Sequence, residues 1–348
     1  MKTSVIGFPR VGKLRELKFA TEKYFRNEIT AQQLEETAED IRKYQWNLQK
    51  ESNIDYIPSN DFSFYDLVLD TAVLFNIVPK EYKELNLSDI DTYFAMARGY
   101  QGENGDVKAL AMKKWFNTNY HYIVPEIEDD TEIKLVGTNP FKYYSEAKKD
   151  GIETKPVVVG PFTLLKLARF TGNKSVEEFV DDTIKAYSEL LNELSKLGVN
   201  WIQFDEPFLV HDITKEDLTL FDKIYNAVLA KKENIKVLLQ TYFGDIRDSY
   251  ENITKLKFDA IGLDFIEGKE TLNLIEKYGF PKDKILFAGL VNGKNIWRNN
   301  YEKTISTLNL LKNKGIEIVL STSCSLLHVP FTVENETKLS KDVLKHFA

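Results

Sequence analysis

The sequence predicts an α/β protein whose parallel strands and helices close into a TIM-like (β/α)8 barrel. Three observations point to this class. Short β-branched and aromatic runs alternate along the chain with longer segments of helical periodicity. The strand runs are almost continuously apolar, which is typical of a parallel sheet covered on both faces. The length of 348 residues suits an α/β barrel with insertions.

The expected strands are spaced so that a helix fits between most neighbours. The first is a short run at 4–7 that leads into a turn containing Pro9 and Gly12. The others are expected at 54–57, 120–124, 156–160, 199–204, 237–243, 260–265, 285–291 and 316–321. These are nine candidates, one more than the barrel needs. Either the opening run is an addition to the barrel, or a middle run belongs to a hairpin outside it.

Helix ends are marked by capping residues. Thr30 with Gln33 predicts a capping box, and Ser175 with Glu178 predicts another. The helix that Ser175 opens is expected to close at Gly198, just before a strand. The helix after Thr30 carries an apolar stripe at Leu34, Ala38, Ile41 and Leu48.

No low-complexity run or Pro/Ser-rich linker divides the chain. We therefore expect one barrel domain over 1–348. The segment at about 14–112 is rich in helical patterns and predicts a helical N-terminal extension packed beside the barrel.

Composition narrows the class of partner and compartment. The net charge of −7 argues against nucleic acid or a membrane surface as the main partner. The sequence contains no run of about 20 apolar residues and no signal-peptide pattern at its start. Its single cysteine excludes an intrachain disulfide framework. These features predict a cytoplasmic protein.

A basic cluster stands near the N-terminus of this acidic chain. Between Arg10 and Arg26 there are six Lys or Arg residues against two Glu. If the helix includes Arg15 and Lys18, their spacing of three puts both on one face, with Leu14 and neighbouring apolar residues facing inward. A helix start favours anions, so a carboxylate or phosphate ligand is one interpretation. A solvated, lysine-rich helix is the other.

Polar residues are expected at the carboxyl ends of the strands, where barrels carry their sites. Adjacent Asp205 and Glu206 point to opposite faces of a strand, so they are not expected to act on one atom. A carboxylate that caps the next helix is an equally good interpretation. The set comprises Asn60, Asp61, Asp205, Glu206, Gly244, Asp245, Asp264, Asn292, Gly293, Ser323 and Cys324.

A metal site is not expected from the histidines and the cysteine. Cys324 and His328 are four residues apart, and a lone pair falls short of the three or four ligands that zinc needs. His121 lies between tyrosines and predicts a packing role. His211 has only Asp212 beside it, and the last histidine, at position 346, is expected in solvent.

Several motifs carry a resemblance to a known family. They are the segment from Gly7 to Lys18, the thirteen residues from Lys114 to Glu126, Gln203 to Pro207, and Ser323 to Pro330. Together they resemble the amino-terminal half of cobalamin-independent methionine synthase. The catalytic half of that enzyme has no counterpart in this sequence.

The resemblance implies a function and a set of contacts. The family transfers a methyl group from 5-methyltetrahydrofolate polyglutamate to a zinc-bound homocysteine thiolate, with the zinc held by the catalytic half. That half carries a His-x-Cys pair on its sixth strand. The segment here that matches this pair, 240–245, contains neither residue type. The folate contacts carried over by the motifs are Arg15, Glu16, Leu17, Lys18 and Lys114.

Three hypotheses remain open. In the first, the chain binds the folate tail and supports an absent zinc-bearing barrel, so that it is inactive alone and holds no metal. In the second, it is a stand-alone folate-binding protein or related barrel enzyme. In the third, it is a scaffold whose basic helix is merely solvated. No complete ligand or acid–base set is evident in the sequence, which favours the first.

Overall fold

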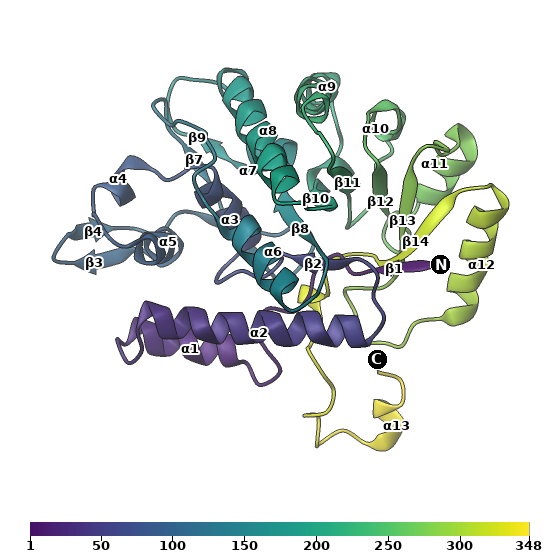
Figure 1. The fold of residues 1–348 in the computed structure, drawn as a ribbon, viewed down its shortest axis with the longest axis horizontal. Helices are drawn as coiled ribbons and strands as arrows, with labels where there is room; N and C mark the ends of the chain where they lie inside the picture. Colours follow the sequence, from purple (N-terminus) through teal and green to yellow (C-terminus); the bar gives the residue numbers. More distant parts are fainter. Residues whose placement is uncertain (348) are drawn as a thin grey trace.

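The computed structural model describes residues 1–347, and its centre is a closed barrel of eight parallel strands (Figure 1). The strands are β1 (Lys2–Ser4), β2 (Ile57–Ser59), β8 (Thr154–Val159), β10 (Trp201–Asp205), β11 (Lys236–Gln240), β12 (Ala260–Asp264), β13 (Ile285–Val291) and β14 (Glu317–Thr322). Each pairs in parallel with its neighbours. The order of the strands around the sheet is β1-β14-β13-β12-β11-β10-β8-β2. A parallel bridge between Ser4 of β1 and Tyr56, just before β2, joins the two ends of this order. The predicted fold class is therefore confirmed.

The ninth strand candidate belongs to a hairpin outside the barrel. Residues 120–124 supply β6 (His121–Ile123), which pairs antiparallel with β5 (Met112–Lys114). The opening run is a true barrel strand, although it pairs over Lys2–Ser4 rather than 4–7. The second of the two sequence interpretations is thus the correct one.

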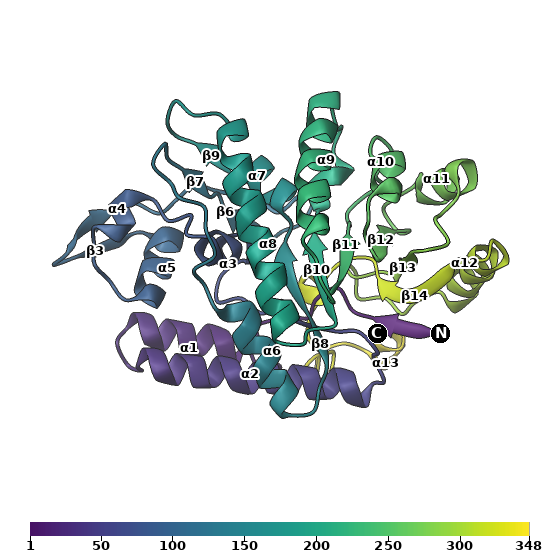
Figure 2. The same ribbon diagram turned by 45° about the horizontal axis from the view of Figure 1, so that its top comes forward.

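Helices surround the barrel (Figure 2). They are α6 (Asn139–Lys149), α7 (Pro161–Leu167), α8 (Val180–Lys196), α9 (Lys215–Ala230), α10 (Tyr250–Lys255), α11 (Thr271–Tyr278) and α12 (Tyr301–Asn313). Short helical turns add η1 (Val176–Phe179), η2 (Pro207–Val210), η3 (Leu326–His328) and α13 (Lys341–Leu344), and two short strands, β7 (Glu126–Ile127) and β9 (Arg169–Phe170), pair beside the barrel. The main core lies between these helices and the outer face of the sheet.

The segment at 14–112 is rich in helix, as expected, and contains the barrel strand β2. Its helices are α1 (Glu16–Phe25), α2 (Ala31–Glu51), α3 (Leu67–Leu74), α4 (Lys80–Lys83) and α5 (Asp89–Arg98), followed by the hairpin of β3 (Tyr100–Gly102) and β4 (Gly105–Val107). Helices α1 and α2 lie side by side in both views (Figures 1 and 2). Both predicted capping boxes are present, at Thr30 and at Ser175. None of the helices in the described part of the chain is long and apolar enough to cross a membrane.

Candidate functional site

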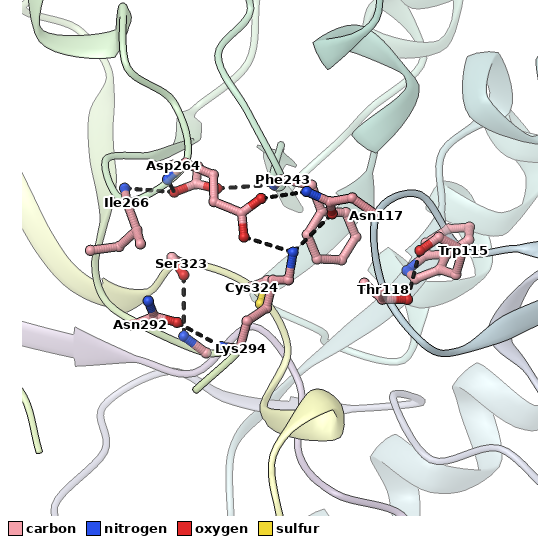
Figure 3. Close-up of polar contacts among 12 residues, drawn as sticks. Trp115, Asn117, Thr118, Phe243, Asp264, Ile266, Asn292, Lys294, Ser323 and Cys324 are labelled. Carbon is pink, nitrogen blue, oxygen red and sulfur yellow. Dashed lines mark hydrogen bonds and ion pairs between the residues drawn. The ribbon is translucent and has the colours of Figure 1, made fainter. Parts of the chain in front are cut away.

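The mouth of the barrel, where the strands end, is covered by the turn of the β5–β6 hairpin. Asn117 in this turn donates to the Glu267 carboxylate over 2.7 Å and accepts from Lys294 Nζ over 2.9 Å. Lys294 also forms a 2.7 Å ion pair with Glu267. Figure 3 shows the side chains of Asn117 and Lys294 pointing toward one another beside Phe243. This Asn117–Glu267–Lys294 cluster ties the hairpin to the loops after β12 and β13.

Aromatic contacts also hold the β5–β6 hairpin against the mouth of the barrel. Trp115 is buried against Tyr242, with ring centroids 6.5 Å apart, and Tyr120 meets the edge of His328 at 5.3 Å. Burial lowers the pKa of His328 to about 4, with the Lys294 charge adding to the effect, so its imidazole is neutral at pH 7. The centre of the barrel mouth, on the face where barrels usually carry their sites, is therefore covered by the chain's own side chains.

Beneath the hairpin, the interior of the barrel holds a buried polar network. Lys155 Nζ donates to the Val5 carbonyl over 3.0 Å and to the side chain of Gln203. Gln203 donates to Asp205 over 2.7 Å, and Tyr242 donates to the same carboxyl over 3.0 Å. Burial raises the pKa of Asp205 and lowers that of Lys155. Every member has a partner, so the network stabilises the barrel and leaves little capacity for a ligand.

Glu206 points away from this network, as the alternation along a strand requires. Its carboxyl accepts the N–H groups of Phe162 and Thr163, at 3.0 and 2.7 Å, and the Tyr225 hydroxyl at 2.5 Å. Burial raises its pKa to about 7. Glu206 therefore caps α7, which is the structural one of the two interpretations left open for it.

The residues around Cys324 do not fit the zinc that the family resemblance implies for the whole enzyme. The Cys324 thiol is 1% exposed, and burial raises its pKa, which disfavours the thiolate that zinc requires. The nearby Asp264 carboxyl already accepts three backbone N–H groups, from Phe243, Ile266 and Glu267. Among residues 1–347, no three His, Cys, Asp or Glu side chains gather as a metal site.

One part of the family comparison needs correction. The segment 240–245 follows β11, which is the fifth strand of the barrel in chain order, whereas the His-x-Cys pair was assigned to a sixth strand. The sixth strand here is β12, and it ends at Asp264. Cys324 follows the eighth strand, β14.

The predicted tail-binding segment stands at the start of α1, with one change. Arg15 lies outside the helix, in the left-handed region with φ 65°, because α1 begins at Glu16. The prediction that Arg15 and Lys18 share a helical face is therefore wrong. Both side chains are nevertheless exposed. Arg15 forms no side-chain hydrogen bond or ion pair within residues 1–347, while Lys18 makes a loose 3.4 Å pair with Glu22.

The other members of that segment hold the loop in place. Leu17 is 2% exposed and packs against α2, whereas Leu14, expected to face inward, is 62% exposed. The Glu16 carboxylate accepts the Leu14 N–H over 2.9 Å. It lies against Gly12, whose φ of 82° suits glycine and where a Cβ would clash with the carboxylate. No side chain caps the first turn of α1.

Lys114 is at the end of β5 and is exposed. It lies on a strand, next to Lys113, which is also exposed. Its register partner is His121, which is exposed, so the packing role predicted for that histidine is wrong. His211 is also exposed and stacks on Phe116. The histidine at 346 is exposed, as predicted.

A narrow pocket is lined by residues of both the N-terminal loop and the hairpin. Arg10 lines one side and donates to the carbonyls of Ser63 and Phe64, each over 3.2 Å. His121 lines the other side. The loop that leads to Arg15 and the hairpin that carries Lys114 thus both contribute residues to one pocket.

Two acidic side chains of the α3 segment, Asp66 and Asp70, form hydrogen bonds near this pocket. Asp66 caps α3 through the N–H groups of Val68 and Leu69, and it also accepts the Ile123 N–H of the hairpin over 2.9 Å. Asp70 accepts the Tyr93 hydroxyl over 2.7 Å, and burial raises its pKa to about 7. Sequence reasoning missed both residues, as it missed Glu267 and Lys294. Only the position of Asp66 one residue before an apolar helix could have suggested a cap.

Comparison with known proteins agrees with these observations. Residues 2–315 match the family model described as "Cobalamin-independent synthase, N-terminal domain". The chain is 57% identical over its full length to a 5-methyltetrahydropteroyltriglutamate–homocysteine methyltransferase of Lactococcus lactis, of which it covers 46%. Proteins of the same name from Streptococcus suis and Campylobacter jejuni are 57% and 56% identical, with the same coverage. The chain thus spans about half the length of these relatives.

Two solved structures share the fold. A putative vitamin-B12 independent methionine synthase from Listeria monocytogenes gives a TM-score of 0.67 at 16% identity, covering 94% of this chain and 91% of that one. A B12-independent methionine synthase from a Shewanella species gives 0.62 at 16% identity, covering 91% and 86%. The family match and the close relatives lead to one conclusion: the chain belongs to the cobalamin-independent methionine synthase family and corresponds to its amino-terminal domain.

Proposed function

We propose that this chain binds the polyglutamate tail of 5-methyltetrahydrofolate for a methyltransferase that converts homocysteine to methionine. The relatives it matches carry the corresponding name, and it spans about half of their length. In this proposal residues 1–348 form a single barrel domain. Methyl transfer and zinc binding would then belong to a second, carboxyl-terminal barrel, which this chain would support, and the chain alone would be inactive.

The observation that carries the proposal is the uncapped start of α1. The first N–H groups of a helix need acceptors. Here no side chain supplies one, the Leu17 N–H donates to the Val11 carbonyl over 3.2 Å, and the N–H groups of Glu16 and Lys18 have no acceptor within residues 1–347. Arg15 and Lys18 add two exposed cations at the same place. A γ-linked glutamate chain offers carboxylates that can accept from both the helix start and the guanidinium fork.

Glu16 and Leu17 have indirect roles in this proposal. Leu17 anchors α1 through its buried side chain, and Glu16 fixes the loop through the Leu14 N–H. Both therefore position the helix start. The Leu17 N–H already donates to the Val11 carbonyl over 3.2 Å, so of the two backbone N–H groups only that of Glu16 is without an acceptor within residues 1–347. Glu16 is not expected to contact the tail through its carboxylate, since the two charges would repel.

The tail would run from the hairpin to the start of α1. Lys114 supplies a cation on the hairpin, and the pocket shared by His121 and Arg10 lies between the two segments. A tail with several carboxylates in a row is needed to contact both Lys114 on the hairpin and the start of α1. The proposal therefore favours long tails over a single glutamate.

Calorimetric titration with 5-methyltetrahydrofolate triglutamate, with zinc measured on the same sample, tests this function. We expect binding that weakens when Arg15→Glu and Lys18→Glu are combined. The variant Lys23→Glu changes an exposed lysine at the other end of the same helix and is the matched control. Lys114→Glu tests the hairpin end of the route.

Each alternative gives a different result. Equal affinities of the triglutamate for the wild-type chain and the double variant would reject the tail site and favour a scaffold. Methyl transfer by this chain alone, with stoichiometric zinc, would instead identify a stand-alone enzyme.

A further inference from the structure

The segment from Ser63 to Asp66, which we call the connector, joins the two parts of the chain that the proposed function assigns to the tail. At one end of the connector, Arg10 of the N-terminal loop donates to the carbonyls of Ser63 and Phe64, each over 3.2 Å. At the other end, the Asp66 carboxylate accepts the Ile123 N–H of β6 over 2.9 Å. The connector is therefore bonded both to the loop that leads to α1 and to the β5–β6 hairpin.

Tyr93 of α5 holds the middle of the connector. Its hydroxyl accepts the Tyr65 N–H over 3.0 Å, lies 3.3 Å from the Ser63 hydroxyl and donates to Asp70 over 2.7 Å. Ser63 and Tyr93 are buried, at 3% and 8% exposed. Buried polar groups that satisfy one another make a segment rigid. The connector is thus a fixed spacer between the N-terminal loop and the hairpin.

The two oxygens of the Asp66 carboxylate have different partners. Oδ1 accepts the N–H groups of Val68 and Leu69, over 2.8 and 2.9 Å, and so caps α3. Oδ2 accepts the Ile123 N–H and no other hydrogen bond within residues 1–347. A substitution can therefore break the link to the hairpin and still keep the cap.

We infer that Asp66 is a positioning residue: through the connector it fixes the spacing between the hairpin and the N-terminal loop, and this spacing selects long tails. The inference rests on the proposed function and adds the origin of its preference for several glutamates. Asp66 is not expected to contact the tail, because two negative charges repel.

The physical reason is that the tail engages two places at once. Two sites bind one ligand more tightly than either site alone only when their spacing matches the length of the ligand. Here the two places are Lys114 on the hairpin and the start of α1. If their spacing is fixed before binding, the tail does not have to order the hairpin, and less binding energy is lost. A single glutamate reaches only one of the two places and gains nothing from the connector.

The variant Asp66→Asn separates the two partners of the carboxylate. Asparagine caps a helix as well as aspartate does, so it retains an acceptor for Val68 and Leu69. Its amide NH₂ would then face the Ile123 N–H, donor against donor. We expect the affinity for 5-methyltetrahydrofolate triglutamate, measured by calorimetry, to fall severalfold, and that for the monoglutamate to stay unchanged. Loss of a negative charge beside the tail would by itself tighten binding, so the expected change is opposite to the purely electrostatic one.

Two further variants accompany this test. Tyr93→Phe releases the middle of the connector without altering any charge or the cap of α3, and Tyr93 does not line the pocket, so the same loss of triglutamate affinity is expected. Asn300→Ala is the matched control, because it removes the cap of a different helix, α12, whose start does not line the pocket either. It should leave both affinities unchanged.

A double-variant cycle distinguishes positioning from a general loss of stability. If Asp66 acts through the hairpin, Asp66→Asn should have no further effect on triglutamate binding once Lys114→Ala has removed the cation that the hairpin carries. Additive losses would overturn the inference. Equal triglutamate affinities of the wild-type chain, Asp66→Asn and Tyr93→Phe would also overturn it, while the tail site stands. Failure of the wild-type chain to bind the triglutamate would overturn the proposed function and this inference together.

Discussion

The mouth of the barrel and the start of α1 differ in how completely their polar groups are satisfied. At the mouth, Asp264 accepts three N–H groups and Glu206 accepts three donors. At the start of α1, no side chain caps the helix and Arg15 has no side-chain partner within residues 1–347. Carboxylates that are already saturated stabilise a fold, whereas unsatisfied donors remain available to bind. The comparison teaches that the polar residues at the strand ends are mostly structural here.

The largest expected effect tests the structural side of this comparison. Glu206→Ala leaves the N–H groups of Phe162 and Thr163 and the hydroxyl of Tyr225 buried without an acceptor. We expect the free energy of unfolding to fall by about 3 kcal/mol, as measured by urea denaturation. Glu206→Gln retains an acceptor and should lose less. A loss below about 0.5 kcal/mol, the range of ordinary surface substitutions, would contradict the capping role.

The second prediction concerns pH. Burial, with a contribution from the charge of Asp66, raises the pKa of Asp70 to about 7 in the folded chain, against about 3.9 in an unfolded one. Between these values the folded state retains a proton that the unfolded state has lost, so stability falls as pH rises. The slope for one such group is about 1.4 kcal/mol per pH unit. Asp70→Asn keeps the acceptor for Tyr93 and should flatten the measured dependence by up to that amount between the two pKa values.

The third prediction tests the closure of the mouth. Lys294→Met removes the ion pair to Glu267 and the bond to Asn117, at the cost of about 1 kcal/mol, because the pair is partly exposed. We expect the amide protons of the hairpin, residues 112–123, to exchange several-fold faster in hydrogen-exchange measurements. Lys269→Met changes an exposed neighbouring lysine and should have no such effect. Unchanged exchange in the hairpin would show that its aromatic contacts hold it without the cluster.

The smallest expected effects lie at the start of α1. Each exposed charge contact to a folate tail is worth about 1 kcal/mol or less, so Arg15→Glu should weaken triglutamate binding severalfold and monoglutamate binding less. At 1 M salt, where the screening length is about 3 Å, the difference should disappear. A difference that persists at high salt would point to a mainly non-electrostatic contact.

Much of the fold could be predicted because its signals are local. Apolar strand runs gave the parallel sheet, and Thr30 and Ser175 marked their helices correctly. The ambiguity over the ninth strand could not be resolved, since a run of two to four β-branched and aromatic residues looks the same in a barrel and in a hairpin. The structure separates them through pairing: β6 meets β5, which has no apolar pattern of its own.

The site was harder to predict than the fold. Family motifs pointed to Arg15, Lys18 and Lys114, but Arg15 proved to be in a left-handed conformation that no helical spacing reveals. Lys294 and Glu267 were missed because they acquire meaning only when tertiary structure brings them to Asn117, about 150 residues away for Glu267. The opposite orientations of Asp205 and Glu206 were predictable, because they follow from strand alternation alone.

The closure of the barrel has a consequence for synthesis. Strand β1 pairs with β14, and the Ile6 N–H donates to the Thr322 hydroxyl across a separation of 316 residues. A ribosome adds about 5–20 residues per second, so β1 waits for its partner for a time on the order of tens of seconds. During that interval β1 (Lys2–Ser4) and the apolar residues Val5 and Ile6 that follow it lack the contacts that β14 supplies in the folded chain. The order of the strands therefore means that the barrel closes only after the last strand has been synthesised.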